Sequence, residues 1–156
     1  MINNIEFKNL EDMGNIKNVI SELFGVTLDI SGGWGYDANS SVIINNLDMP
    51  INQFLNLFAM VRANMEMNIT VDSDNRYSGI NVSLEEQKNI DIEDKSYQVV
   101  TFKITAMNEK IYKNFITEYK ENLNKEEFDL SNHFKRRDES KITRVVDYWF
   151  YNLHTK

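Results

Sequence analysis

Hydrophobic side chains in the first part of the chain recur at helical spacing and then switch to strict alternation. A helix is predicted between Asn9 and Gly25, because asparagine caps helix starts and glycine ends them. Its apolar stripe consists of Met13, Ile16, Ile20 and Leu23. From 26 to 30 apolar and polar residues alternate, which predicts a half-buried strand. Turn-forming residues at 37–41 precede the apolar run 42–44, so a β-hairpin should follow.

The middle of the chain carries its most apolar helical pattern, followed by short alternating runs. Asp48 and Pro50 mark the start of a second helix. Its apolar positions are Ile51, Phe54, Leu55, Phe58, Val61 and Met65. Residues 68–72, 77–84, 88–92 and 97–106 then read as strands, and polar turns at 72–75 and 93–96 separate them.

Two further helices are predicted towards the C-terminus. Asn108 caps the first, and Ser140 caps the second, whereas the charged segment 125–139 between them fits no single pattern. The inward stripe of the last helix is Ile142, Val145, Val146, Trp149 and Leu153. The sequence therefore predicts a single α+β domain over residues 1–156. Its sheet is mostly antiparallel, with about five to six strands, and helices pack on one face.

Charge and composition indicate which class of partner and which cellular compartment to expect. The chain has 17 Lys and Arg against 24 Asp and Glu, a formal net charge of −7, which disfavours nucleic acid and favours a basic protein surface as partner. The absence of cysteine excludes disulfides and thiol nucleophiles and fits a reducing compartment. Since no apolar run is long enough for a membrane span and the N-terminus lacks a secretion pattern, a cytoplasmic protein is expected.

The segment Gly32-Gly33-Trp34-Gly35-Tyr36-Asp37 concentrates three of the six glycines and one of the two tryptophans. If it is extended, Trp34 and Tyr36 project to one side and the glycines leave the other side bare. The bare side would admit another backbone, a side chain or a ligand, so a core role and a binding role both stay open. A dinucleotide loop is not expected, because Ala38 replaces the third glycine and a β run follows instead of a helix.

No catalytic, cofactor or metal residues are predicted, and the chain is not expected to be an enzyme. The turn 72–75 opens like a calcium loop, but Tyr77 and Ser83 occupy the positions that require a glycine and a bidentate acid. His133 and His154 are the only histidines and do not form a spaced pair, so both are expected at the surface.

Acidic residues gather around the second half of the predicted sheet. They form either a solvated rim or a negative patch that docks a basic partner. They are Asp72, Asp74, Glu85, Glu86, Asp91, Glu93 and Asp94. The aromatic run 148–151 adds a second candidate surface, because four consecutive helical positions cannot all face one core; Trp149 is predicted to point inward.

A small, acidic, cysteine-free α+β protein in which residues 32–37 lead into Val42-Ile43-Ile44 resembles the immunity proteins of bacterial toxin systems, including contact-dependent growth inhibition and other polymorphic toxins. The resemblance implies a protein that neutralises a cognate toxin, often a basic nuclease, by covering its active or substrate-binding surface. It assigns no individual functional residue. The acidic patch, together with Trp34, Tyr36 and Asp37, is the contact surface that we expect for such a toxin.

Two other functions fit the same sequence. A dimeric secretion chaperone or adaptor is also small, acidic and without catalytic residues. A small-ligand-binding domain or enzyme would use a cleft beside residues 32–37.

Overall fold

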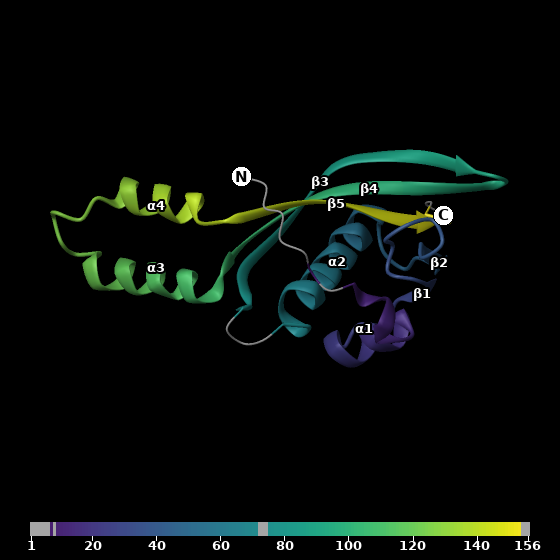
Figure 1. Cartoon of the computed structure of the whole chain (residues 1–156), viewed down its shortest axis with the longest axis horizontal. Helices are drawn as coiled ribbons and strands as arrows, with labels where there is room; N and C mark the ends of the chain where they lie inside the picture. Colours follow the sequence, from purple (N-terminus) through teal and green to yellow (C-terminus); the bar gives the residue numbers. More distant parts are fainter. Residues whose placement is uncertain (1–6, 8, 72–74, 154–156) are drawn as a thin grey trace.

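The sheet has five strands in the order β1-β2-β5-β4-β3. The computed structural model describes residues 7, 9–71 and 75–153. The strands are β1 (Asp29–Gly32), β2 (Val42–Asn46), β3 (Tyr77–Ile92), β4 (Lys95–Asn108) and β5 (Ile142–Tyr151). Adjacent strands are antiparallel except for β2 and β5, which run parallel. The predicted α+β class with a mostly antiparallel sheet is confirmed (Figure 1).

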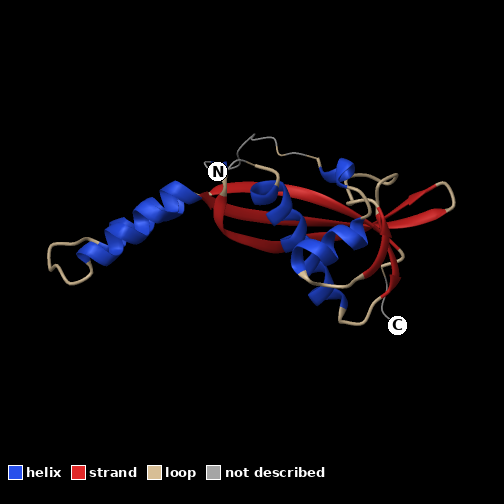
Figure 2. Cartoon of the chain, turned by 90° about the horizontal axis from the view of Figure 1, so that it is seen from below, coloured by secondary structure: helices blue, strands red, loops and turns tan. Residues whose placement is uncertain are grey.

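The helices divide into two groups. They comprise a short 3-10 helix η1 (Leu10–Met13), α1 (Ile16–Phe24), α2 (Ile51–Asn64) with its π-helical continuation η2 (Met65–Ile69), α3 (Glu109–Asn122) and α4 (Leu130–Glu139). As predicted, α1 and α2 pack on one side of the sheet, here called the inner face. In contrast, α3 and α4 form a helical arm, residues 109–139, that extends beyond one end of the sheet (Figures 1 and 2). No helix in the described part of the chain covers the opposite, outer face.

The predicted first helix is two helices. Asn9 caps η1, and Gly14 breaks the chain direction with φ 99° before Asn15 caps α1. Gly25 ends α1 in the left-handed conformation, φ 68°, as its position predicted. The β1–β2 hairpin is also confirmed, with its bend in the predicted loop.

The segment after α2 differs from its prediction. Residues 68 and 69 belong to η2 and not to a strand, because the N–H of Thr70 donates to the carbonyl of Met65 at 3.1 Å and so closes a wider helical turn. The rest of that predicted strand is irregular at Thr70 and Val71, and Asp72 lies outside the described residues. The two strands predicted at 77–84 and 88–92 are one continuous strand, β3, with a register irregularity between Leu84 and Glu86.

The helix predicted after Ser140 is wrong. Ser140 ends α4, with its N–H donating to the carbonyl of Arg136 at 3.1 Å, and the following residues form β5. The apolar residues in 142–150 fit both a helical and an alternating period. The segment forms a strand because it pairs laterally with β2 and β4. Alternation turns Tyr148 and Phe150 into the core, both fully buried, and places Trp149 on the outer face, opposite to its prediction.

Aromatic rings form the centre of the core between α2 and the inner face. Phe58 stacks on Phe54 with ring centroids 6.1 Å apart, and Phe150 from β5 contacts Phe58 edge-on at 5.7 Å. Val100, Phe102 and Ile104 of β4 are fully buried on the same face. The apolar stripe of α2 thus meets the inner face of the central strands, as its pattern predicted.

The helical arm has a small aromatic core of its own around His133. This side chain was predicted at the surface, but it is buried, with 1% of it exposed. Ring centroids within 5.8 Å of its imidazole belong to Phe115, Tyr119, Phe128 and Phe134. The Nδ1 atom of His133 lies 3.1 Å from a carboxylate oxygen of Glu118, which also pairs with the guanidinium of Arg136. His154 lies outside the described residues.

The arm should lose order in acid before the rest of the molecule. Hydrogen bonds from Arg136 and then His133 lower the pKa of Glu118 to about 2 from an ordinary 4.5. Because this pKa is lower in the folded state, the stabilisation is complete above about pH 4.5 and is lost as pH falls towards 2. We expect the ring-current shifts of Phe115 and Tyr119 in NMR spectra to decrease over this interval.

The Glu118→Gln variant is the matched control. It removes the titrating carboxylate, so its aromatic shifts at neutral pH should already resemble those of the wild type in acid. They should also change little between pH 4.5 and 2. Identical acid transitions in the two proteins would show that another group controls the arm.

Candidate functional site

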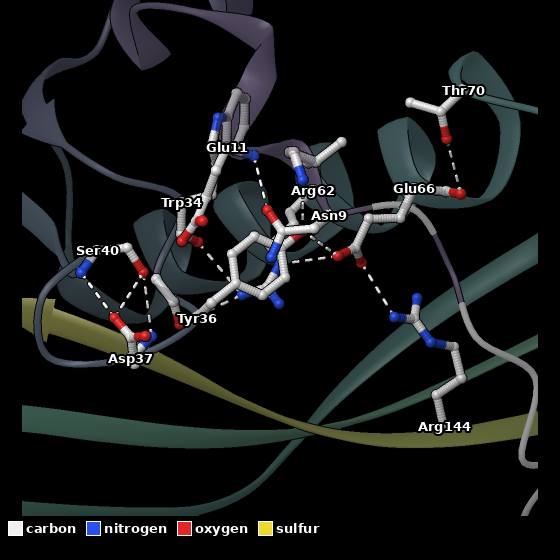
Figure 3. Close-up of polar contacts among 12 residues, drawn as sticks. Asn9, Glu11, Trp34, Tyr36, Asp37, Ser40, Arg62, Glu66, Thr70 and Arg144 are labelled. Carbon is white, nitrogen blue, oxygen red and sulfur yellow. Dashed lines mark hydrogen bonds and ion pairs between the residues drawn. The ribbon is translucent and has the colours of Figure 1, made fainter.

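A buried ionic cluster lies directly behind the glycine-rich segment (Figure 3). Arg62 on α2 and Glu66 on η2 are each 1% exposed, and Nε of Arg62 donates to Oε2 of Glu66 at 3.3 Å. Arg144 of β5 donates from Nη2 to the other carboxylate oxygen, Oε1, at 3.1 Å. One carboxylate therefore bridges two guanidinium groups that come from different layers of the fold.

Arg62 holds the glycine-rich segment against this cluster. Its guanidinium carbon lies 3.9 Å from the ring centroid of Tyr36 and 4.1 Å from that of Tyr148. Its Nη1 donates to the carbonyls of Trp34 at 3.2 Å and of Gly35 at 3.4 Å. Because these rings and carbonyls present negative faces to the cation, they help to replace the water that Arg62 loses on burial.

Tyr36 connects the cluster to the N-terminal segment. Its hydroxyl donates to Oε2 of Glu66 at 2.6 Å and accepts from the N–H of Leu10 at 3.1 Å. Burial, followed by the negative charge of Glu66, raises the pKa of Tyr36 well above its ordinary value. The phenol consequently stays protonated and keeps donating to the carboxylate across the physiological pH range.

The bare side of the glycines faces backbone. A Cβ on Gly33 would lie 2.5 Å from the carbonyl oxygen of Ser40. Gly35 has φ 90°, a Cβ there would lie 3.0 Å from the carbonyl oxygen of Trp149, and the Trp149 N–H donates to Gly35 at 2.9 Å. Both glycines are therefore required by close backbone approach, and the segment has a role in the core.

Trp34 and Tyr36 do not form the surface that the sequence suggested. Trp34 is 1% exposed and stacks on Phe58 with centroids 6.3 Å apart, so its side chain does not reach solvent. Tyr36 is partly buried and points towards Glu66. Asp37 is oriented within its own loop, where it accepts from the N–H of Ser40 at 2.8 Å.

Five of the predicted acids lie along the exposed hairpin of β3 and β4, residues 85–96, which we call the acidic hairpin; Glu85 and Glu86 lie on the edge of the sheet, and the other three lie at or near the turn. Within the described residues none of the five has an ion pair or a side-chain hydrogen bond, and all are exposed. They are Glu85, Glu86, Asp91, Glu93 and Asp94, accompanied by only Lys88 and Lys95. Asp72 and Asp74 lie outside the described residues.

The tip of the acidic hairpin, residues 91–96, projects from the end of the sheet opposite the helical arm (Figures 1 and 2). Pairing between β4 and β5 ends at Tyr97 and Tyr151, so the turn at 93–94 lies beyond β5. Glu93 adopts φ 56°, a backbone region that L-residues other than asparagine and aspartate rarely occupy. Both faces of the hairpin are accessible near its turn.

The cleft predicted beside the glycine-rich segment is a small pocket on the outer face. It has a volume of about 200 Å³, and its lining includes Gly32, Lys95, Tyr97 and Tyr151. Ligand pockets typically have several hundred cubic ångströms, so this pocket suits a single side chain better than a cofactor. Among the described residues no group of three or more His, Cys, Asp or Glu is placed to hold a metal ion.

Comparison of this chain with protein-family models, curated proteins and solved structures found no match. None of the helices within the described ranges combines the length and the apolar character needed to cross a bilayer. Functional inference therefore depends on the geometry of the chain itself.

Sequence reasoning missed the ionic cluster. Arg62 and Glu66 are four residues apart at the end of the most apolar helix, where an opposite-charge pair usually indicates an exposed helix face. Arg144 belongs to the strand that was predicted as a helix. The detectable signal was the position of Arg62 beside Val61, within the apolar stripe of α2.

Removing the shared carboxylate should destabilise the protein strongly. Glu66→Ala leaves the buried Arg62 and the partly buried Arg144 without a counter-ion, and breaking a buried pair in this way costs about 3–5 kcal/mol. Urea denaturation would measure this change in the free energy of unfolding. Glu86→Ala, which removes an exposed carboxylate, should stay within about 0.5 kcal/mol of the wild type. A similarly small effect at Glu66 would contradict a structural role for the cluster.

Proposed function

We propose that this protein is a non-enzymatic immunity protein that binds a basic toxin domain through the acidic hairpin and covers the toxin's active or substrate-binding surface. The observation that carries this proposal is the set of five exposed acids along one hairpin, none of which has an ion pair within the part of the chain that the structure describes. The acidic net charge of −7 and the resemblance noted from the sequence support the same function.

Among the described residues, some acids of the helical arm, unlike the five of the hairpin, have a cationic partner nearby. Glu109 pairs with Lys113 at 2.9 Å and Asp138 with Lys141 at 3.2 Å, so the helical arm largely neutralises its own surface. On the hairpin, in contrast, Glu86 faces Thr101 and Asp91 faces Ser96, so neither carboxylate has a cationic residue directly opposite it on β4. A cationic partner would supply the missing counter-charge on binding.

The shape of the hairpin suits a concave basic surface. Two strands that extend beyond the sheet expose both of their faces, so they fit into a cleft instead of lying against a flat surface. A nuclease binds the phosphates of its substrate in a positively charged cleft. Carboxylates on a narrow projection would compete for the same cationic groups, and their field would accelerate the encounter.

Charge reversal on the hairpin should slow association with the toxin. Affinity capture from the native cells, followed by mass spectrometry, identifies the partner, and stopped-flow mixing of the purified proteins then gives the rate constant. The triple variant Glu86→Lys, Asp91→Lys and Glu93→Lys should associate at least roughly tenfold more slowly at low ionic strength, because steering of this kind contributes about 10- to 1000-fold. Its thermal unfolding should remain cooperative.

A matched control changes the same total charge at a distance from the hairpin. Glu121, Glu126 and Glu127 are exposed on the helical arm, and their replacement by lysine should leave the association rate nearly unchanged. Equal slowing by both triple variants would show that net charge alone steers the partner. An unchanged rate for the hairpin variant would remove the acidic hairpin from the binding surface.

A further inference from the structure

The outer edge of β3 is open to another strand. Among residues 7, 9–71 and 75–153, β3 pairs with β4 only, and it is the last strand of the sheet on that side. The side chains at 83–89 are all exposed. Unpaired N–H and C=O groups along such an edge are able to pair with an additional strand.

The contacts of Trp149 identify which residues of β3 direct their backbone groups outward. The N–H of Trp149 donates to Gly35, and its carbonyl also lies on that side of β5, away from β4. Val99, which faces Trp149, must therefore direct its backbone groups towards β3, where it pairs with Lys88. In an antiparallel strand the N–H and C=O of one residue point to the same side of the strand. The backbone groups of Lys88 therefore point inward, towards β4.

The turn of the acidic hairpin gives the same answer independently. Ile92 and Lys95 close a two-residue turn, so their backbone groups are hydrogen-bonded to each other and Ile92 points towards β4. The register between β3 and β4 is unbroken from 86 to 92. The backbone N–H and C=O groups of successive residues therefore point alternately towards β4 and away from it along this stretch. The residues with outward backbone groups are therefore Gln87, Asn89 and Asp91.

This stretch has neither a proline nor a bulge, two of the features with which proteins block exposed edges; a third is charged side chains, lysine above all. Its own charges, Glu86, Lys88 and Asp91, are mainly negative and so disfavour an acidic strand more than a basic one. Both register irregularities of β3 lie before residue 87, the chain's single proline is Pro50, and Lys88 is the one lysine within 86–92. The backbone groups of Gln87, Asn89 and Asp91 thus offer alternating hydrogen-bond donors and acceptors to a partner strand.

We propose that residues 86–92 of β3 accept an extended basic segment of the partner as an additional strand of the sheet. This inference rests on the proposed function and specifies how the partner is held. Charge complementarity identifies the occupant, because Glu86, Asp91, Glu93 and Asp94 flank the open edge. A second copy of this chain is disfavoured, since residues 85–96 carry five acids against two lysines and two such segments would repel each other.

The test uses synthetic peptides and the intact protein. The probe is a nine-residue peptide of alternating lysine and valine, labelled for fluorescence anisotropy at low ionic strength. The control peptide has the same sequence but is N-methylated at its three central residues, which blocks strand pairing on both edges and keeps every charge. The protein variants are Asn89→Pro, which removes one outward N–H, and Asn89→Ala, which retains it.

Strand addition predicts a specific set of affinities. The unmodified peptide should bind the wild type and Asn89→Ala about equally. Binding should weaken about tenfold or more for the N-methylated peptide, because several backbone hydrogen bonds are lost, and measurably for Asn89→Pro. In hydrogen-exchange NMR the amides of Gln87, Asn89 and Asp91 should exchange fast in the free protein and slow on peptide binding, whereas Lys88 and Ile90 should be protected throughout.

Other outcomes would overturn the inference. Equal binding of the two peptides would mean attraction by charge alone, which leaves the acidic hairpin as the contact surface but excludes strand addition. Absence of peptide binding would exclude it as well, whereas the proposed function would still be judged by the association rates with the folded partner. A dimer in sedimentation equilibrium that Asn89→Pro dissociates would identify a second copy as the occupant instead.

Discussion

The carboxylate of Glu66 is the one group on which the arrangement of the whole inner layer depends. It lies between two guanidinium groups in an interior where an unpaired charge is strongly unfavourable, so α2 and β5 must keep the spacing that allows both ion pairs. Tyr36 adds the N-terminal segment to the same carboxylate. Through Arg62 the cluster also fixes the glycine-rich segment, which packs directly against the backbone of β5.

Two projections extend from this rigid centre, and their construction differs. The helical arm stabilises itself with the aromatic rings around His133 and with ion pairs along its surface. The acidic hairpin has neither, since its side chains near the turn face solvent on both sides. The surface that we propose for binding is thus attached through β4 to the central strand β5, while the carboxylates of its five acids remain without ion pairs among the described residues.

Part of the candidate site could be predicted from sequence. Polar turns concentrate charged residues, so the acids at 85–94 were expected at turns and hairpin ends; Asp91, Glu93 and Asp94 lie there, whereas Glu85 and Glu86 lie within the continuous strand β3. For Trp34 and Tyr36 the sequence left a core role and a binding role open, because rare aromatic residues beside glycines occur in both settings. Their true environment depends on Phe58 and Arg62, which lie more than twenty residues away in sequence. No local pattern reports such a contact.

The sequence by itself determined the α+β class, the extent of α2, the β1–β2 hairpin and the strongly negative surface, because each follows from local periodicity, turn chemistry or net charge. Only the tertiary structure decided that 142–151 is a strand, since its apolar residues fit two periods and its neighbours β2 and β4 supply the missing hydrogen bonds. It also decided which side of β3 stays open. Backbone pairing between distant segments carries no signature in the order of side chains, and for that reason it had to be read from the fold.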